Sequence, residues 1–578
     1  VGLSADVRVL FSQPTLAALA AAVGGGASDV TVPENAIPDD CMRITPEMLP
    51  LADLDQAAID LIVASVPGGV ANVQDIYPLA PLQEGILYHH LAADAGDPYV
   101  LQSVFEIADR ARLNAFVGAL QSVVDRHDIL RTAVQWQGLE TPVQVVCRQA
   151  RLPVEQVELD PLEGPIMAQL QQRFDPRHSR LDMSQAPLLR LVFAEDQPNQ
   201  RWAAILLFHH MVLDHTALEV VLHDMQAHLL GQADQLEVAI PYRNYVAQAR
   251  LGVSREDHEA FFREQLGDID EPTLPFGLLD VQGDGRDIEE SSLTLDRQLN
   301  LRLRAQARQL GVSAASLVHL AWAQVLSQVS GRQSVVFGTV LIGRMQSGEG
   351  AERALGMFIN TLPLRVDLAG QGARAGVRAT HAQLTALLGH EHAPLVLAQR
   401  CSGVAAPLPL FSALLNYRHS PAREASGGER WADAQVLGVR ERTNYPLSLS
   451  VDDQGEGFLL SVQVAAGFDG QRICSYMQTA LNHLVEALES APDSAVRDLS
   501  VVPETESQQL LVAFNDTARD YPQQQTVHGL FEAQVRAYPE ACAAIHDGVA
   551  VSYAELNTRS NRLARHLLGL GVQPGDSV

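Results

Sequence analysis

The segment 202–229 constrains the fold more than any other part of the chain, because three local patterns follow one another within it. Trp202 to Phe208 is an apolar run of strand length. The sequence HHMVLDH follows at residues 209–215. Apolar residues then recur on one face of a helix, at Leu218, Val221, Leu222, Met225 and Leu229. We therefore predict a strand, a short polar turn and an amphipathic helix.

The turn after this strand carries side chains that can transfer protons. An imidazole with an ordinary pKa can take a proton from an amine or a hydroxyl group at neutral pH. Asp214 could accept a ring N–H or bind an arginine, and Thr216 with Glu219 has the spacing of a capping box. A buried histidine pair satisfied by backbone groups explains the same dipeptide without catalysis. A shared metal is disfavoured, because the adjacent residues His209 and His210 point to opposite faces of a strand.

Length, charge and cysteine content bound the class of protein. At 578 residues the chain can hold several domains, and 47% hydrophobic with 19% charged residues is typical of a soluble globular protein. The net charge of −28 argues against a nucleic-acid partner, since phosphate binding needs clustered lysine and arginine. The five cysteines are widely spaced without a CxxC pair, which fits a reducing cytoplasm and no zinc site. Without a signal peptide at Val1 or a run of about 18 apolar residues, we expect no membrane partner.

Periodic segments elsewhere predict further elements. Helices are expected at 56–66, 113–124, 301–310, 316–329 and 557–568, and strands at 132–134 and 334–340. Thr45 followed by Pro46 is a helix-start signal. Pro363 argues against a central paired position for the segment around it.

The 209–215 sequence resembles the HHxxxDG signature of condensation domains in nonribosomal peptide synthetases, with His215 in place of the usual glycine. Further segments resemble other markers of this family and follow the family's order. They are YPLAPLQEG at 77–85, RHDILRT at 126–132, PYRNY at 241–245 with Asn244 in place of Asp, GMFINTLPLR at 356–365, HEHAP at 390–394 and NYPL at 444–447. We interpret the His-x-His pair of HEHAP as structural.

His89 and His90 open a second histidine motif. The sequence HHLAADAGD at 89–97 matches the HH[I/L]xxxxGD pattern that marks dual epimerisation/condensation domains. The resemblance thus implies that the donor residue is epimerised before condensation. From the residues alone, the second pair either adds a proton-transfer group near the donor Cα or only closes a loop through Gly96.

The resemblance also implies a domain organisation and a fold. The expected boundaries are 1–23 for the end of a peptidyl carrier domain, 24–69 for a linker, 70–250 and 251–500 for the N-lobe and C-lobe of the condensation domain, and 501–578 for a linker and the start of an adenylation domain. The implied fold class is α/β, with two chloramphenicol-acetyltransferase-like lobes in a V-shaped pseudo-dimer around a central tunnel. Ser4 lacks the glycines of a phosphopantetheine attachment site, and the adenylation fragment lacks the nucleotide loop.

The implied reaction is attack of a carrier-bound acceptor amine on a carrier-bound donor thioester. The expected partners are the upstream donor and downstream acceptor peptidyl carrier domains and the adjacent adenylation domain. Substrates would travel on 4′-phosphopantetheine, while no cofactor and no metal is expected to bind the chain directly. The catalytic candidates are His210 as the central residue, His209, Asp214 and His215. The supporting candidates are Arg131, which the family pattern pairs with Asp214, and His89, His90, Asn444 and Tyr445.

Three other functions stay open from the sequence. A condensing domain without epimerisation would keep His210 and would not need His89 and His90. A stand-alone epimerase would give racemised donor and no peptide. A non-catalytic docking domain for carriers or other partners usually has a damaged histidine motif, whereas the motif is intact here.

Overall fold

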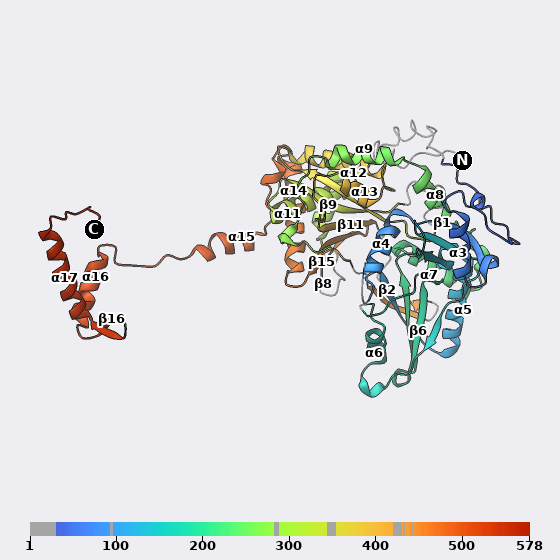
Figure 1. Cartoon of the computed structure of the whole chain (residues 1–578), viewed down its shortest axis with the longest axis horizontal. Coiled ribbons are helices and arrows are strands. Elements are labelled where there is room, and N and C mark those ends of the chain that lie inside the picture. Colours follow the sequence, from blue (N-terminus) through green and yellow to red (C-terminus); the bar gives the residue numbers. More distant parts are fainter. Residues whose placement is uncertain are drawn as a thin grey trace. The chain divides into compact units, whose positions relative to one another are not determined.

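The computed structural model describes residues 30–92, 96–176, 178–281, 288–343, 354–419, 430–431, 434–440 and 443–578. The side chains of residues 215, 216 and 430–442 lie outside this description, and so does the predicted carrier remnant at 1–23. The chain divides into two compact units, Val1–Pro503 and Glu504–Val578. Within its described residues, the first unit contains two six-stranded sheets and one three-stranded sheet (Figure 1).

The first lobe is built on a sheet with the strand order β12-β13-β2-β7-β6-β5. The strands are β2 (Val100–Ile107), β5 (Val154–Gln156), β6 (Leu189–Asp196), β7 (Arg201–His209), β12 (Arg430–Trp431) and β13 (Ala434–Arg440). β7 is a central strand that pairs antiparallel with β2 on one side and β6 on the other. The predicted strand at 202–208 is therefore confirmed.

Both faces of β7 are buried. Its even-numbered residues from 204 to 208 pack in one core with α5 (Arg110–Arg126) and α7 (His215–Leu229). Its odd-numbered residues from 203 to 207 pack on the opposite face with α6 (Ile166–Arg173), and Figure 1 shows α5 and α6 on either side of these strands. The period of two along a strand explains why the run is apolar without alternation.

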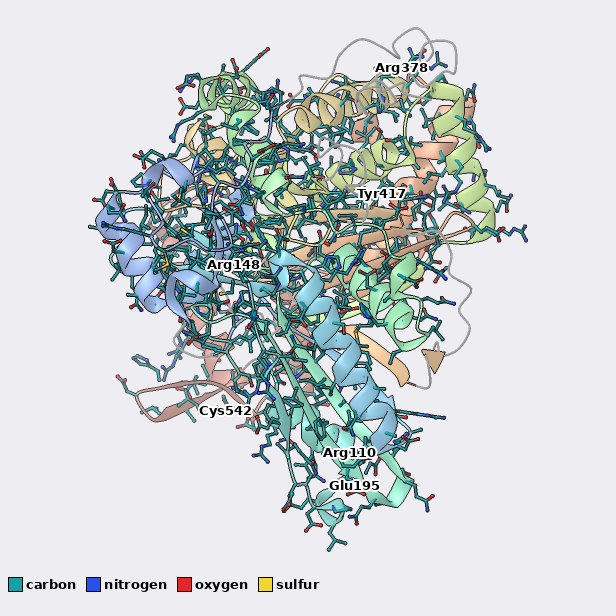
Figure 2. All side chains as sticks on the ribbon, turned by 90° about the vertical axis from the view of Figure 1, so that its right-hand side faces the viewer. Arg110, Arg148, Glu195, Arg378, Tyr417 and Cys542 are labelled. Carbon is teal, nitrogen blue, oxygen red and sulfur yellow. The ribbon has the colours of Figure 1, made fainter. Side chains whose placement is uncertain are left out.

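The two ends of β7 differ in chemistry. At its beginning, the guanidinium of Arg110 lies 4.8 Å from the ring centroid of Trp202 and 5.0 Å from that of Phe193 (Figure 2). Such cation–π contacts stabilise this end of the sheet. At its other end the strand delivers His209.

Residues 37–66 belong to the folded core of the first lobe, so the interpretation of 24–69 as a linker is wrong for this part. Ile44 and Ile59 are buried against the three-stranded sheet β1-β4-β3, because apolar residues of this segment share one face. Thr45 precedes a 3-10 helix with proline at its start, as predicted. The elements are η1 (Pro46–Met48), α3 (Gln56–Ser65), β1 (Val73–Pro78), β3 (Thr132–Gln135) and β4 (Val143–Cys147).

The second lobe is built on a sheet with the strand order β10-β9-β11-β14-β15-β8. Its strands are β8 (Ile288–Thr294), β9 (Ser334–Leu341), β10 (Asn360–Asp367), β11 (Ala413–His419), β14 (Leu447–Asp453) and β15 (Phe458–Ala465). Its helices include α10 (Arg297–Leu310), α11 (Ala314–Ser330), α12 (Ala373–Leu388) and α14 (Gly470–Ser490). Pro363 lies in the edge strand β10, which agrees with its missing N–H.

α11 is buried along most of its length. Among the described residues, no single helix is both long and apolar enough to cross a membrane. The pair α10 and α11 meets that criterion only when taken together, with a bend of 110° between them.

Two strands from the part of the sequence assigned to the C-lobe lie in the sheet of the first lobe. β13 pairs antiparallel with β2, and β12 pairs with β13. The boundary at residue 250 is therefore wrong for residues 430–431 and 434–440. An antiparallel edge can accept a strand from any distance along the sequence, which is why no local pattern indicated this exchange.

The second unit has elements of its own. They are α15 (Glu504–Leu511), α16 (Val527–Ala537), β16 (Cys542–His546), β17 (Val549–Ser552) and α17 (Tyr553–Gly569). The predicted helix at 557–568 lies within α17 and is confirmed, and the two strands form an antiparallel hairpin.

His319 in α11 is a buried neutral histidine of the second lobe. Its Nδ1 lies 2.7 Å from the carbonyl of Ala315, which can only accept, so Nδ1 carries the proton and Nε2 accepts from the Thr339 hydroxyl at 2.8 Å. Burial lowers the pKa of His319 to about 4. As the pH falls from about 6.5 to about 4, the unfolded chain takes up a proton that the folded chain excludes, so the free energy of unfolding decreases.

We predict that His319→Leu weakens this pH dependence by up to about 1.4 kcal/mol per pH unit. Urea denaturation at several pH values between 4 and 6.5 measures the slope. The matched control is His419→Leu in the same lobe, because 65% of the His419 side chain is exposed. The control should keep the wild-type slope, and an unchanged slope for His319→Leu would contradict the prediction.

Candidate active site

The end of β7 and the start of α7 set the geometry of the histidine turn. β7 ends at His209 and α7 begins at His215. Asp214 is the N-cap of α7, and its Oδ1 accepts a hydrogen bond from the Ala217 amide at 2.7 Å. The predicted capping box on Thr216 is therefore wrong, because the helix begins before this residue and Asp214 satisfies the third amide of the first turn.

His210 lies in this turn, half-buried, and both its backbone and its ring are held. Its backbone N–H donates to the carbonyl of Tyr99 at 2.8 Å, and its Nδ1 lies 2.9 Å from the carbonyl of Leu213. A carbonyl can only accept, so Nδ1 carries the proton of the neutral ring. Nε2 is then the basic nitrogen, which is the tautomer that a proton acceptor at Nε2 requires.

His209 is completely buried, and each of its ring nitrogens has a hydrogen-bond partner. Nδ1 accepts from the Met211 amide at 3.0 Å, so the neutral ring carries its proton on Nε2. Nε2 lies 3.0 Å from the carboxylate of Asp97. His209 is therefore not placed to exchange a proton with a substrate.

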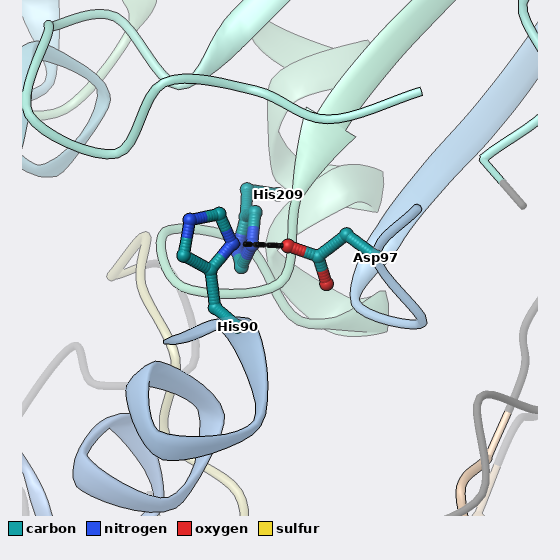
Figure 3. A group of neighbouring side chains, drawn as sticks. All are labelled: His90, Asp97 and His209. Atoms are coloured by element: carbon teal, nitrogen blue, oxygen red, sulfur yellow. Dashed lines mark hydrogen bonds and ion pairs between the residues drawn. The ribbon is translucent and has the colours of Figure 1, made fainter. Parts of the chain in front are cut away.

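Asp97 joins the histidines of the two motifs (Figure 3). The Nδ1 of His90 lies 2.5 Å from Oδ2 of Asp97, the same oxygen that His209 contacts, while Oδ1 accepts from the Tyr99 amide at 2.9 Å. Burial by itself would raise the pKa of this carboxyl, but the hydrogen bonds from His209 and His90 outweigh it and lower the pKa below its ordinary value. Asp97 is thus an ionised acceptor of three N–H groups.

The second histidine motif places its two rings differently. The hydrogen bond from His90 to Asp97 joins the two ends of this motif, and Gly96 has the positive φ of +71° that a glycine adopts without strain. His89 is half-buried, with its ring centroid 6.0 Å from that of Tyr99. Burial lowers the pKa of His89, and the charge of Asp97 offsets this only in part, so the neutral ring is favoured.

Tyr99 connects the histidine turn to the second lobe. Its hydroxyl donates to Oδ1 of Asn444 at 3.3 Å, and Nδ2 of Asn444 donates to the carbonyl of Val281 at 2.7 Å. Burial raises the pKa of Tyr99, which keeps the hydroxyl protonated. Tyr445 stacks on Phe411 with a centroid distance of 5.8 Å. Asn444 and Tyr445 lie in the loop directly before β14.

A second connection between the lobes runs through Asp214. Its Oδ2 accepts from the Phe358 amide at 3.3 Å, and its own N–H donates to the carbonyl of Gly356 at 3.3 Å. The hydroxyls of Tyr242 and Tyr245 donate to the carbonyls of the two residues after this glycine, at 2.5 and 3.1 Å. The segment 354–358 of the second lobe is therefore fixed against the start of α7.

Comparison with known proteins identifies the family of the chain. A family model described as "Condensation domain" matches residues 73–511, which is more than half of the chain. The chain belongs to the condensation-domain family. A model described as "AMP-binding enzyme" matches residues 531–578, so the start of an adenylation domain follows the condensation domain.

The chain is similar to parts of very long synthetases. Malpinin synthetase from Mortierella alpina is 50% identical over 578 residues, which are 100% of this chain and 7% of that protein. A linear gramicidin synthase from Brevibacillus parabrevis is 35% identical over 553 residues, which are 92% of this chain and 7% of that protein. The chain thus spans only a small part of these relatives.

Solved structures confirm the two-lobed α/β fold class. A four-domain nonribosomal peptide synthetase bound to AMP and glycine has a TM-score of 0.70 at 16% identity, covering 87% of this chain and 39% of that one. The first condensation domain of the calcium-dependent antibiotic synthetase, in complex with a substrate analogue, has a TM-score of 0.56 at 19% identity. That match covers 74% of this chain and 100% of the other.

The predicted pairing of Arg131 with Asp214 in the condensation domain is wrong. The guanidinium of Arg131 instead donates to the carbonyls of Val124, Cys147 and Arg148 and to the side-chain oxygen of Gln74. Arg131 ends η3 (Asp128–Arg131), directly before β3, so its side chain lies over the neighbouring turns of its own lobe. Asp214 accepts backbone amides instead.

One catalytic candidate, His215, has a side chain that the structure does not describe. His215 is the first residue of α7. Two partners of the turn, Asp97 and Tyr99, were not among the predicted site residues. The Gly-Asp that ends the second histidine motif carried a signal for Asp97. The contact of Phe358 with Asp214 had none, because the two residues are 144 positions apart.

We predict that Gly356→Ala loosens the contact between segment 354–358 and the turn. A Cβ at this position would lie 2.2 Å from Cδ2 of Tyr242, and the φ of +148° disfavours any L side chain. The expected loss is about 1–3 kcal/mol of unfolding free energy, measured by thermal or urea denaturation. Gly455→Ala is the control, because its φ is +78° but nothing lies within 4 Å of the added Cβ. Equal losses in the two variants would show that the contact with Tyr242 is unimportant.

Proposed function

We propose that this condensation domain joins a carrier-bound donor aminoacyl or peptidyl thioester to the amino group of a carrier-bound acceptor, with His210 as the central residue. The observation that carries the proposal is the state of the His210 ring. Its Nδ1–H is engaged by Leu213, so Nε2 carries the lone pair that can accept a proton. His209 next to it is buried and fully engaged.

In the proposed reaction, every bond and proton is accounted for by the two substrates and His210. The acceptor amine attacks the thioester carbonyl, a C–N bond forms, and the C–S bond to the donor carrier breaks. The proton lost by the amine nitrogen passes to Nε2 of His210 and from there to the departing sulfur, which leaves as the thiol of the 4′-phosphopantetheine arm. His210 ends the cycle neutral, as it began.

Positioning and proton transfer contribute differently to the rate. Holding two tethered reactants face to face can supply effective molarities of about 10⁵ M or more. Proton transfer by a placed imidazole typically adds about 10²- to 10⁴-fold. His210 serves both purposes in this proposal, because its backbone and Nδ1 are fixed while Nε2 is the basic atom of the ring.

We further propose that the donor residue is epimerised before condensation. The support is the second histidine motif, whose His89 lies half-buried beside Tyr99, the residue that holds the backbone of His210. Epimerisation removes the Cα proton of the donor thioester and returns a proton on the opposite face. Nε2 of His210 can accept a proton in this exchange, and so can the ring of His89, whose neutral form is favoured because burial lowers its pKa.

The test supplies the chain with one donor and one acceptor carrier domain, each charged with an aminoacyl-phosphopantetheine arm. A panel of L-amino acids and, in parallel, their D-enantiomers is used as donors. Dipeptide is measured by mass spectrometry and its configuration by chiral chromatography. We expect D,L-dipeptide from both donor series. L,L-dipeptide from L-donors would indicate condensation without epimerisation, and racemised donor without peptide would indicate an epimerase.

We predict that His210→Ala lowers dipeptide formation at least about 10²-fold with either donor configuration, because it removes both the base and the positioned ring. The matched control is His223→Ala on α7, since 70% of this side chain is exposed and it lies outside the turn. The control should retain wild-type activity. Wild-type condensation of a D-donor by His210→Ala would overturn the central role of this residue.

A further inference from the structure

Three described side chains from different parts of the first lobe converge on one buried point. His90 lies in the last turn of α4 (Pro81–Ala92), Asp97 in the loop before β2, and His209 at the end of β7. Their exposed fractions are 6%, 3% and 0%. Figure 3 shows both rings directed at the same carboxylate oxygen. Side chains this deeply buried offer little surface to a substrate, and their hydrogen bonds are to one another and to the backbone nearby.

A metal site is the first alternative, because these three residues offer ligand atoms within 4.8 Å of one another. The hydrogen bonds argue against it. Nδ1 of His209 accepts the Met211 N–H, so Nε2 holds the proton of the neutral ring. A metal on Nε2 would move that proton to Nδ1 and set two N–H groups against each other. The distances of 2.5 and 3.0 Å to Asp97 are those of hydrogen bonds.

The same carboxylate also reaches the backbone of the histidine turn. Oδ1 of Asp97 accepts the Tyr99 N–H at 2.9 Å, and the Tyr99 carbonyl accepts the His210 N–H at 2.8 Å. Oδ2 holds the ring of His209, the residue directly before His210. Two residues that bind Asp97 therefore hold the backbone of His210. Tyr99 accepts its N–H, and His209 precedes it in the chain.

We propose that Asp97, itself oriented by His90, is the positioning residue for His210 in this condensation domain. In this arrangement His90 acts as a fixed hydrogen-bond donor to Asp97 and not as a proton-transfer group. The network also fixes Tyr99, whose hydroxyl reaches Asn444 of the second lobe. A shift of Asp97 thus moves both the His210 backbone and a contact between the lobes.

The loss of one hydrogen-bond donor from an ionised, buried carboxylate has a high free-energy cost. Removing one N–H from a buried carboxylate leaves part of its charge unsatisfied, and the group then rotates or draws in water. A displacement of about 1 Å in a placed reacting group can cost on the order of 100-fold in rate. The predicted effect therefore lies in kcat, while substrate binding changes little.

The test replaces His90 in two ways. His90→Asn puts an amide N–H where the Nδ1–H of the ring lies and keeps the donor to Asp97, whereas His90→Leu fills similar space without a donor. Asp97→Asn removes the charge and leaves one acceptor oxygen, so its NH2 group must face either the two ring N–H groups or the Tyr99 N–H. Asp224→Asn is the matched control, because Asp224 is also buried in the first lobe and accepts from His127 at 2.8 Å and Arg126 at 3.1 Å, outside the histidine turn.

We expect kcat for dipeptide formation within about threefold of wild type for His90→Asn, and about 10- to 100-fold lower for His90→Leu and Asp97→Asn, with KM unchanged. Asp224→Asn should lower the melting temperature but leave kcat near wild type. Equal impairment of His90→Asn and His90→Leu would assign the ring itself to proton transfer and overturn the proposal. Near wild-type kcat for all variants would also overturn it, as would activity lost on dialysis against EDTA and restored by Zn²⁺.

The inference rests on the proposed function, and a second readout separates the two. Hydrogen exchange followed by mass spectrometry reports on the amides of residues 208–214 without any substrate. We expect their protection to fall in His90→Leu and Asp97→Asn and to persist in His90→Asn. If the wild-type chain forms no peptide, the proposed function fails while this pattern still decides the positioning role. Unchanged protection in all variants would remove that role.

Discussion

The burial of β7 on both faces is the constraint on which the rest of the structure depends. Because α5 and α7 cover one face and α6 the other, a slip by one residue would exchange the side chains that fit two different cores and break the packing of both. The last residue of β7, His209, therefore has a fixed position inside the lobe. His210 lies in the turn that follows. The helix after the turn is fixed by the same core, so the turn has two rigid ends. Chemistry that depends on placement can be built on such a turn.

Two carboxylates then hold the turn, each by a different set of donors. Asp97 accepts from two imidazoles and a backbone N–H at the strand end, and Asp214 accepts from the first turn of α7 and from the second lobe. Hydrogen bonds to ionised acceptors are shorter and stronger than those between neutral groups, and burial raises the cost of breaking them. The turn is thus tied to α4 on one side and to segment 354–358 on the other. In the proposed reaction, where two tethered reactants meet, a turn fixed in this way would hold His210 in one place.

Local patterns predicted the regular elements well and the polar partners poorly. The predictions of a strand at 202–208 and of an apolar helical face from Leu218 to Leu229 were correct, because the apolar residues of each segment are the ones that the folded element buries. The assignments of Thr216 as a capping residue and Arg131 as the partner of Asp214 were wrong. A carboxylate can accept from any donor that the fold brings near, and the chain offers it backbone amides as readily as arginines. The segment 37–66, interpreted as linker, and β13, interpreted as part of the second lobe, failed because both pack against strands far away in sequence.

The sequence by itself determined the α/β character of the chain, the strand–turn–helix at 202–229 and the family resemblance, and it indicated His210 for the proposed central role. These follow from side-chain periodicity and from a motif whose spacing is local. Only the tertiary structure decided the hydrogen-bond partner of each histidine. His209 and His90 both bind the same oxygen of Asp97, and Nδ1 of His210 binds the carbonyl of Leu213. The tertiary structure also decided that Phe358 and Asn444 of the second lobe meet the turn. The physical reason is that a hydrogen bond depends on distance and direction in space, and the fold sets both, even for His209 and Asp97, which are 112 positions apart.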